Sequence, residues 1–134
     1  MNPKNIKINV GLEIEKGDAA LRQAEILLKN NEYDGAVSRA YYAVFHYAQA
    51  LLFLKGIEAR SHHALNRLFS LHFVRSGAFE KRFATILSHA QKAREESDYS
   101  PEIPFSSEEA QLRIDEAKDF IDRAGRYLSS PDAA

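Results

Sequence analysis

The chain has 134 residues, with 18 basic and 19 acidic side chains and a formal net charge of −1. This length suits one domain, so we take residues 1–134 as a single helical domain with a core over 10–128 and a frayed tail over 129–134. A net charge near zero provides no global positive field that could hold nucleic acid non-specifically. The absence of cysteine excludes disulfides, thiolate metal sites and cysteine nucleophiles.

Membrane, metal and cofactor sites are not expected. No apolar run is long enough to cross a bilayer, and the first residues lack the apolar stretch of a signal peptide, so we expect a cytoplasmic protein. The histidines have no acidic residues at ligand spacing, which predicts no metal site. The six glycines are scattered and form no phosphate-cradling loop, and no cofactor is implied.

Helical spacing of apolar residues dominates the first half of the chain. It predicts a helix over about 12–29, with Gly17 leaving its start open and Asn30-Asn31 ending it. A second helix over about 33–55 is apolar or aromatic nearly all round, and Gly56 follows it as a C-cap. Such a helix is either central in the domain or also meets a second subunit.

The second half continues the helical pattern with one interruption. Ser61 is the predicted N-cap of a third helix that ends near 76–77, and a fourth helix runs from about 79 to 97. Two prolines make residues 99–105 non-helical, and Ser106 with Glu109 forms a capping box for a last helix reaching Leu128. The predicted fold is all-α, an up-and-down bundle of about five helices.

A polar stripe on the second helix is the first candidate site. Ser38, Tyr42 and His46 lie four residues apart and share one side, with Arg39 and Gln49 beside them. Buried polar groups require hydrogen-bond partners. The stripe is therefore either a structural network, a polar rim at a dimer interface, or part of a ligand site.

Arg94 and Asp98 form the second candidate, because their spacing of four allows an ion pair on the fourth helix. The pair either fastens the end of that helix or presents a guanidinium to phosphate. Two basic patches are also conceivable. One is Arg60, His62, His63 and Arg67, and the other is Arg75, Lys81 and Arg82. We expect each patch to be a solvated face with acids nearby.

Three landmarks give the chain a family resemblance over about residues 10–128. They are Ser38-Arg39-Ala40-Tyr41-Tyr42-Ala43-Val44-Phe45-His46, then Ala24-Glu25 before Tyr33-Asp34-Gly35-Ala36, and Arg94 followed by Ser97-Asp98-Tyr99. The sequence resembles HEPN domains, in particular the short stand-alone prokaryotic branch. This resemblance implies an all-helical homodimer, often encoded beside a minimal nucleotidyltransferase that is its partner.

The resemblance also implies a site in the dimer cleft. In many HEPN proteins an Arg, four to six residues and a His form a metal-independent ribonuclease site, in which His moves protons and Arg stabilises phosphate charge. Here Tyr99 follows Arg94 after four residues, and no histidine follows Arg94. The implied catalytic residues are Arg94, Asp98, Tyr99 and His46, and the implied ligand-binding residues are Ser38, Arg39, Tyr42 and His63. Related toxins accept a nucleotide on a tyrosine near this motif, which makes Tyr99 a candidate acceptor; packing against the proline loop is the alternative.

Three functions follow from these observations. The first is a HEPN-like module that works with a nucleotidyltransferase-type partner in a toxin–antitoxin or defence system and presents Arg94 to RNA or another phosphate-containing ligand. The second is a metal-independent endoribonuclease toxin that pairs Arg94 with a non-standard base such as His46. The third is a nucleotide-binding module. The missing histidine and the neutral charge favour the first and third functions.

Overall fold

The computed structural model describes residues 2–99 and 104–130, apart from the side chain of Tyr99. In these ranges the chain forms five α-helices and no strand. The helices are α1 (Pro3–Lys29), α2 (Tyr33–Leu54), α3 (His62–Phe69), α4 (Lys81–Tyr99) and α5 (Ser107–Leu128), with a π-helical turn, η1 (Ser70–Val74), directly after α3. The predicted all-α class is confirmed.

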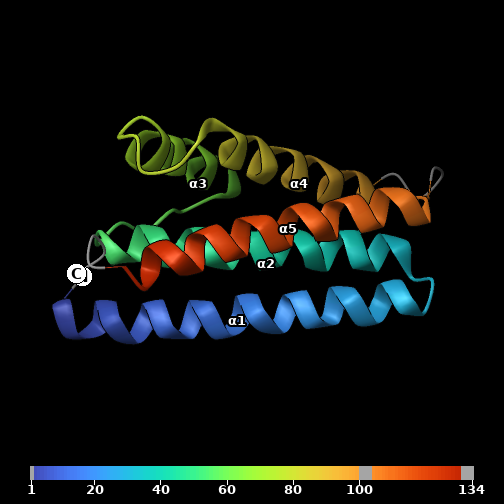
Figure 1. The fold of residues 1–134 in the computed structure, drawn as a ribbon, viewed down its shortest axis with the longest axis horizontal. Coiled ribbons are helices and arrows are strands. Elements are labelled where there is room, and N and C mark those ends of the chain that lie inside the picture. The colour runs from blue at the N-terminus through green and yellow to red at the C-terminus, as the bar shows by residue number, and fades with distance from the viewer. Residues whose placement is uncertain (1, 100–103, 131–134) are drawn as a thin grey trace.

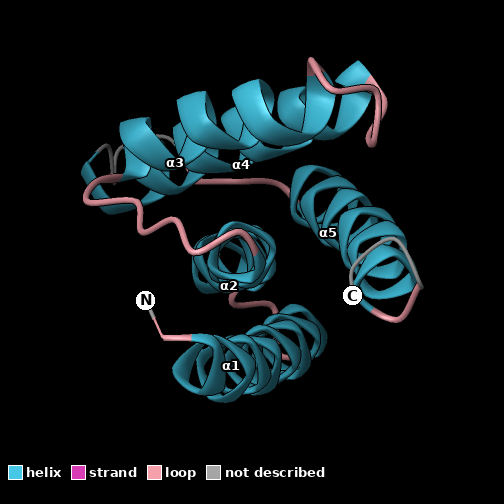
Figure 2. Cartoon of the chain, turned by 90° about the vertical axis from the view of Figure 1, so that its left-hand side faces the viewer, coloured by secondary structure: helices cyan, strands magenta, loops and turns pink. Residues whose placement is uncertain are grey.

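The second helix is central. In Figures 1 and 2, α1 runs antiparallel to α2 on one side, α5 lies beside α2, and α3 and α4 form a layer on the side away from α1. α2 contacts α1, α3, α4 and α5, and eleven of its residues are buried. This confirms the expectation that a helix apolar nearly all round lies inside the bundle. Gly56 follows the helix with a φ of 73°, as a C-terminal glycine should.

α1 is longer than the sequence pattern predicts, since it begins at Pro3 and not near residue 12. Asn2 caps its start by accepting a hydrogen bond from the Lys4 amide. Gly17, which weakened the prediction, is buried against Tyr47, and a Cβ there would lie only 2.5 Å from Cδ2 of that ring. The glycine is therefore a close-packing residue between α1 and α2, and the helix continues through it.

The layer of α3, η1 and α4 is built on aromatic packing. Ser61 caps α3 as predicted, by accepting from the Ala64 amide. The α-helix ends at Phe69, and η1 carries the chain to Val74, so the predicted continuous helix to 76–77 is replaced by a π-helical turn. Phe69 and Phe73 both remain fully buried across this turn, with ring centroids 5.7 Å apart. α4 begins at Lys81, two residues later than predicted.

α5 completes the core and starts as the sequence predicts. Ser106 and Glu109 form the capping box, and just before it the Phe105 amide donates to Asp34 at 3.0 Å, which ties this loop to the start of α2. Its inward face carries Phe120, which is fully buried, whereas Ile121 and Leu128 are only partly buried. Within the described ranges, no helix combines the length and apolar character needed to cross a bilayer.

Candidate functional site

Arg94 lies where α4 crosses over the aromatic side of α2. Its side chain is 14% exposed, and its Nε lies 3.4 Å from Oδ2 of Asp98, as the spacing of four predicted. The guanidinium carbon is 5.8 Å from the centroid of the Tyr41 ring and 5.6 Å from that of Tyr42. Both rings therefore stabilise the cation. Asp98 is the only ion-pair partner of Arg94 among the described residues, and the buried Nε has no hydrogen bond.

A tyrosine–histidine pair lies next to this guanidinium. The hydroxyl of Tyr41 and Nδ1 of His62 are hydrogen-bonded. Burial raises the pKa of Tyr41, so its hydroxyl stays protonated and donates. Burial, and after it the positive charge of Arg94, lowers the pKa of His62. His62 is thus neutral at pH 7, accepts at Nδ1 and carries its proton on Nε2, where it is a hydrogen-bond donor.

A second histidine, His46, pairs with a carboxylate on the side of α2 that faces α1. Nδ1 of His46 is 2.6 Å from Oε2 of Glu13, and both side chains are largely buried, at 18% and 13% exposed. The imidazole donates from Nδ1, which leaves Nε2 as its free nitrogen. The Tyr42 ring lies between this pair and Arg94, 6.3 Å from the His46 ring.

The remaining sequence candidates are placed in different surroundings. Arg39 has its guanidinium carbon 5.2 Å from the Tyr42 ring centroid, and its buried Nε has no hydrogen bond. Ser38 is half-buried and makes no hydrogen bond with the described residues. His63 is exposed and lines a separate hollow with Asn66 and Arg67. The side chain of Tyr99 lies outside the described residues.

The family model of the HEPN domain matches residues 12–127. The chain belongs to the HEPN domain family. "Putative toxin MJ0605" of Methanocaldococcus jannaschii is 37% identical over 125 residues, which cover 93% of this chain and 92% of that protein. A second protein of this organism, "Putative toxin MJ0142", is 30% identical over 117 residues, or 87% of this chain and 80% of that protein. A "UPF0332 protein" of Thermotoga maritima is 32% identical over 108 residues, or 81% of this chain and 82% of that protein.

Three residues that sequence reasoning did not assign to the candidate site contact its residues in this HEPN chain. Tyr41 follows core spacing and gives no sign that its hydroxyl meets a histidine. His62 is the first residue of α3, directly after the Ser61 cap, and that position was the available signal. Glu13 is 33 residues from His46, so only the packing of α1 on α2 brings the two together. Among the described residues, no group of three histidine or carboxylate side chains is arranged to hold a metal ion.

Proposed function

We propose that this HEPN protein is the toxin-like component of a pair with a nucleotidyltransferase-type partner, and that it presents Arg94 to the phosphate of an RNA or a nucleotide. The observation that supports this proposal is the state of the Arg94 guanidinium. It is 14% exposed, it pairs with Asp98 alone among the described residues, and its Nε lacks a hydrogen bond. An arginine so placed gains from a phosphate, whose oxygens accept the unused donors in a bidentate geometry. The names of two relatives support the toxin setting.

The groups around Arg94 favour binding of an anion over transfer of a proton. The Tyr42 hydroxyl has no hydrogen-bond partner among the described residues, so it is available as a donor. His62 is neutral with its proton on Nε2, so it also donates. A cation and two neutral donors suit the non-bridging oxygens of a phosphate. A base that removes the ribose 2′-hydroxyl proton would need a free nitrogen lone pair, which His62 in this tautomer does not offer.

One observation favours the second candidate function, a metal-independent endoribonuclease. Glu13 and His46 form a carboxylate–imidazole pair at 2.6 Å. This arrangement fixes the imidazole and leaves Nε2 to accept a proton, as a general base requires. In this reading Arg94 holds the scissile phosphate, and His46 takes the place of the histidine that the motif lacks.

The proposal also includes a homodimer, because a two-fold axis would bring the two copies of Arg94 into one cleft. Light scattering at micromolar concentration tests this part directly. A mass of twice the chain supports the shared cleft. A mass of one chain contradicts it and leaves each Arg94 site to act alone.

The experiment that separates the functions is incubation of mixed cellular RNA with purified protein in EDTA. The wild type is compared with Arg94→Ala, His46→Gln and His62→Gln. The first proposal predicts that neither the wild type nor any of the three variants cleaves RNA. It also predicts that Arg94→Ala loses RNA binding, whether or not His62→Gln loses it too. Cleavage by the wild type that Arg94→Ala and His46→Gln abolish establishes the endoribonuclease instead. If Arg94→Ala neither weakens RNA binding nor abolishes cleavage, both proposed roles of Arg94, in RNA binding and in cleavage, are contradicted.

The partner is tested by co-expression with a minimal nucleotidyltransferase encoded beside the chain. Co-purification of the two proteins supports the proposed pair. Transfer of a nucleotide to Tyr99 would increase the mass of the peptide that contains it, and Tyr99→Phe is the control. Separate elution of the two proteins without any mass increase contradicts the partnership.

A further inference from the structure

A groove between α3–η1 and α4 concentrates positive charge. Its volume is about 800 Å³, and its cations are Arg67, Arg75 and Lys81, with His63 and His89 beside them. None of the described residues that line it is Asp or Glu, although the whole chain has more acidic than basic side chains. The other lining side chains are hydroxyl, amide or small aliphatic groups. The charge of the molecule is therefore segregated, and this groove holds a local excess of cations.

These cations are free, whereas a neighbouring arginine is not. Arg67, Arg75 and Lys81 make no ion pair and no side-chain hydrogen bond with the described residues. Arg82, the next residue after Lys81, pairs with Asp119 of α5 and with Glu80. Each patch was expected to be a solvated face with acids nearby. The cations are exposed as expected, but acids pair only with Arg82 among the described residues, and the described groove lining contains none. The fold takes parts of two patches that are separate in sequence and joins them in one surface.

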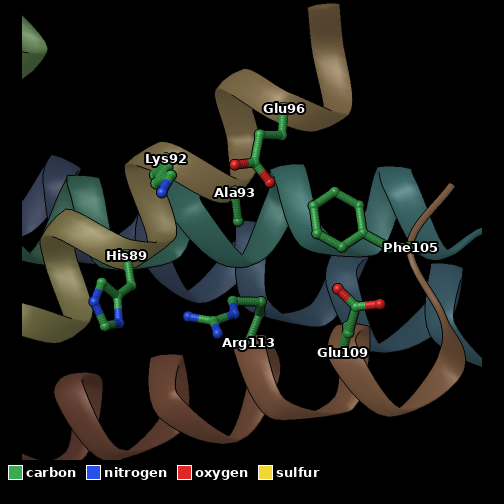
Figure 3. A pocket seen from close by; sticks show the side chains of 7 residues that line it. All are labelled: His89, Lys92, Ala93, Glu96, Phe105, Glu109 and Arg113. Carbon is green, nitrogen blue, oxygen red and sulfur yellow. The ribbon is translucent and has the colours of Figure 1, made fainter. Parts of the chain in front are cut away.

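Two further hollows adjoin the groove along α4, and both contain acids as well as cations. The groove shares His63 and Asn66 with a smaller hollow that Lys92 and Glu95 line, and it shares His89 with a third hollow. In Figure 3, Glu109 of this third hollow lies beside Phe105, and Glu96 lies between Phe105 and Lys92. From Lys81 to His89, the two ends of the groove lining on α4, helical rise gives about 12 Å, or roughly four phosphates at the ~3.4 Å axial spacing of one stacked strand.

The groove is distinct from the Arg94 site. Residues Lys92 and Arg94 are two positions apart on α4, so their side chains leave the helix in directions about 200° apart. Lys92 lines the smaller hollow that adjoins the groove, and Arg94 lies against the tyrosines of α2. A ligand bound in the groove therefore does not contact the guanidinium of Arg94.

The lining selects one kind of ligand. No aromatic side chain other than histidine faces the groove, which leaves no platform for stacking bases. Only Val74 and Ala84 are apolar, so an acidic protein segment would find few of the apolar anchors on which protein interfaces depend. Arginine, lysine, hydroxyl and amide donors without acids match a row of phosphates. We propose that this groove is a second binding surface, which holds the phosphate backbone of single-stranded RNA without reading its sequence. The choice of RNA as the ligand rests on the proposed function, but the binding of phosphates in the groove does not depend on Arg94.

Fluorescence anisotropy of a labelled polyuridine of about 12 nucleotides tests the groove, with salt varied from about 50 to about 300 mM. The groove variant is Arg67→Gln/Arg75→Gln/Lys81→Gln. The matched control is Lys4→Gln/Lys7→Gln/Arg22→Gln, which removes the same charge from exposed, unpaired positions on α1. Because each phosphate contact contributes about −0.7 to the salt slope, the groove variant should reduce the slope by about 2 and weaken binding about tenfold. The control should retain most of the wild-type slope.

The outcomes distinguish this inference from the proposed function. Loss of binding in the groove variant with normal binding by Arg94→Ala supports the groove and contradicts the role of Arg94. Loss of RNA binding in Arg94→Ala with normal binding by the groove variant supports the role of Arg94 and contradicts the groove. Equal losses in the groove and control variants show a net-charge effect and overturn the groove. Displacement of the RNA by polyglutamate of equal charge, as effectively as by unlabelled RNA, also overturns it in favour of an acidic polypeptide. Thermal unfolding checks that each variant is folded. If the triple groove variant is not folded, the single variant Lys81→Gln is used in its place.

Discussion

The two sides of the central helix α2 differ in how their polar groups are satisfied. On the side facing α1, Tyr47 donates to Asp18 at 2.6 Å, His46 meets Glu13 at 2.6 Å, and the Tyr47 ring covers Gly17. On the side facing α4, the Nε of Arg94 has no hydrogen bond and the hydroxyl of Tyr42 has no partner among the described residues. We call the side facing α1 the closed side, because these polar groups pair with one another. We call the side facing α4 the open side, because these donors have no partner among the described residues.

This difference supports the proposed division between polar residues that stabilise the fold and polar residues that bind a ligand. Buried polar groups cost stability unless they are paired, so the pairs facing α1 are what the packing of α1 on α2 requires. The comparison therefore supports a stabilising role for Asp18, Glu13 and His46, and it agrees with the binding role that we propose for Arg94 and Tyr42.

Glycine substitutions test the closed side with the largest expected effect. In Gly17→Ala the new Cβ would lie 2.5 Å from Cδ2 of Tyr47, a ring held in place by Asp18. We expect a loss of about 1–3 kcal/mol in the free energy of unfolding, which exceeds the gain in helix propensity. Gly11→Ala, with no atom within 4 Å of the new Cβ, should gain about 0.5–1 kcal/mol. Urea unfolding measures both, and equal effects would show that α1 is not closely packed at Gly17.

Removal of one carboxylate from each side should produce unequal losses. Glu13→Ala leaves the largely buried His46 without its partner, so we expect a loss of about 1–3 kcal/mol in unfolding free energy. Asp98 is 40% exposed, and Asp98→Ala should cost below about 0.5 kcal/mol because solvent screens this pair. The same change frees Arg94, so RNA binding should tighten. A larger loss of stability in Asp98→Ala than in Glu13→Ala would reverse the assignment of the two sides.

Two hydroxyl deletions sharpen the comparison at a smaller scale. Tyr47→Phe removes a hydrogen bond to a carboxylate and should cost about 1–2 kcal/mol. Tyr42→Phe removes a hydroxyl that has no partner in the described part of the chain, so the free energy of unfolding should change by less than about 0.5 kcal/mol. RNA binding should weaken only in Tyr42→Phe. Normal binding by that variant would exclude its hydroxyl from the site.

The smallest effect is a pH dependence contributed by His62. Its pKa is lowered in the folded chain, so between that value and the unfolded value the unfolded chain binds more protons. The contribution of His62 to stability is present above the unfolded pKa of about 6.5 and decreases as the pH falls toward the folded pKa. Unfolding free energies at pH 7 and pH 5 should differ less in His62→Gln than in the wild type. An equal difference in both proteins would contradict the lowered pKa.

Much of the fold could be predicted because its signals are local. The capping box at Ser106 and Glu109 and the cap at Ser61 are short patterns with a direct physical reading. The early start of α1 was missed because Gly17 lowers helix propensity, and only the contact with Tyr47 explains its presence. The π-helical turn η1 was also missed, since the burial of Phe69 and Phe73 fits an α-helix equally well.

The site was less predictable because its contacts join distant segments. Arg94 and Asp98 lie four residues apart on one helix, so their pair could be read from the sequence. Tyr41 and His62 are 21 residues apart and meet only when α3 folds back on α2. The groove required the relative placement of α3, η1 and α4. This placement pairs Arg82 with Asp119 and leaves Lys81 without an ion pair among the residues that the structure describes.

The measurement that tests the central claim most directly is an NMR titration of the arginine Nε–H signals with a dinucleoside monophosphate. Arg94→Lys identifies the Arg94 signal by its absence. Because the buried Nε of Arg94 has no hydrogen bond with the described residues, its signal should shift strongly and exchange more slowly with water when phosphate binds. A titration that moves the signals of Arg67 or Arg75 and leaves Arg94 unchanged would contradict the account, since the open side of α2 would then bind no phosphate.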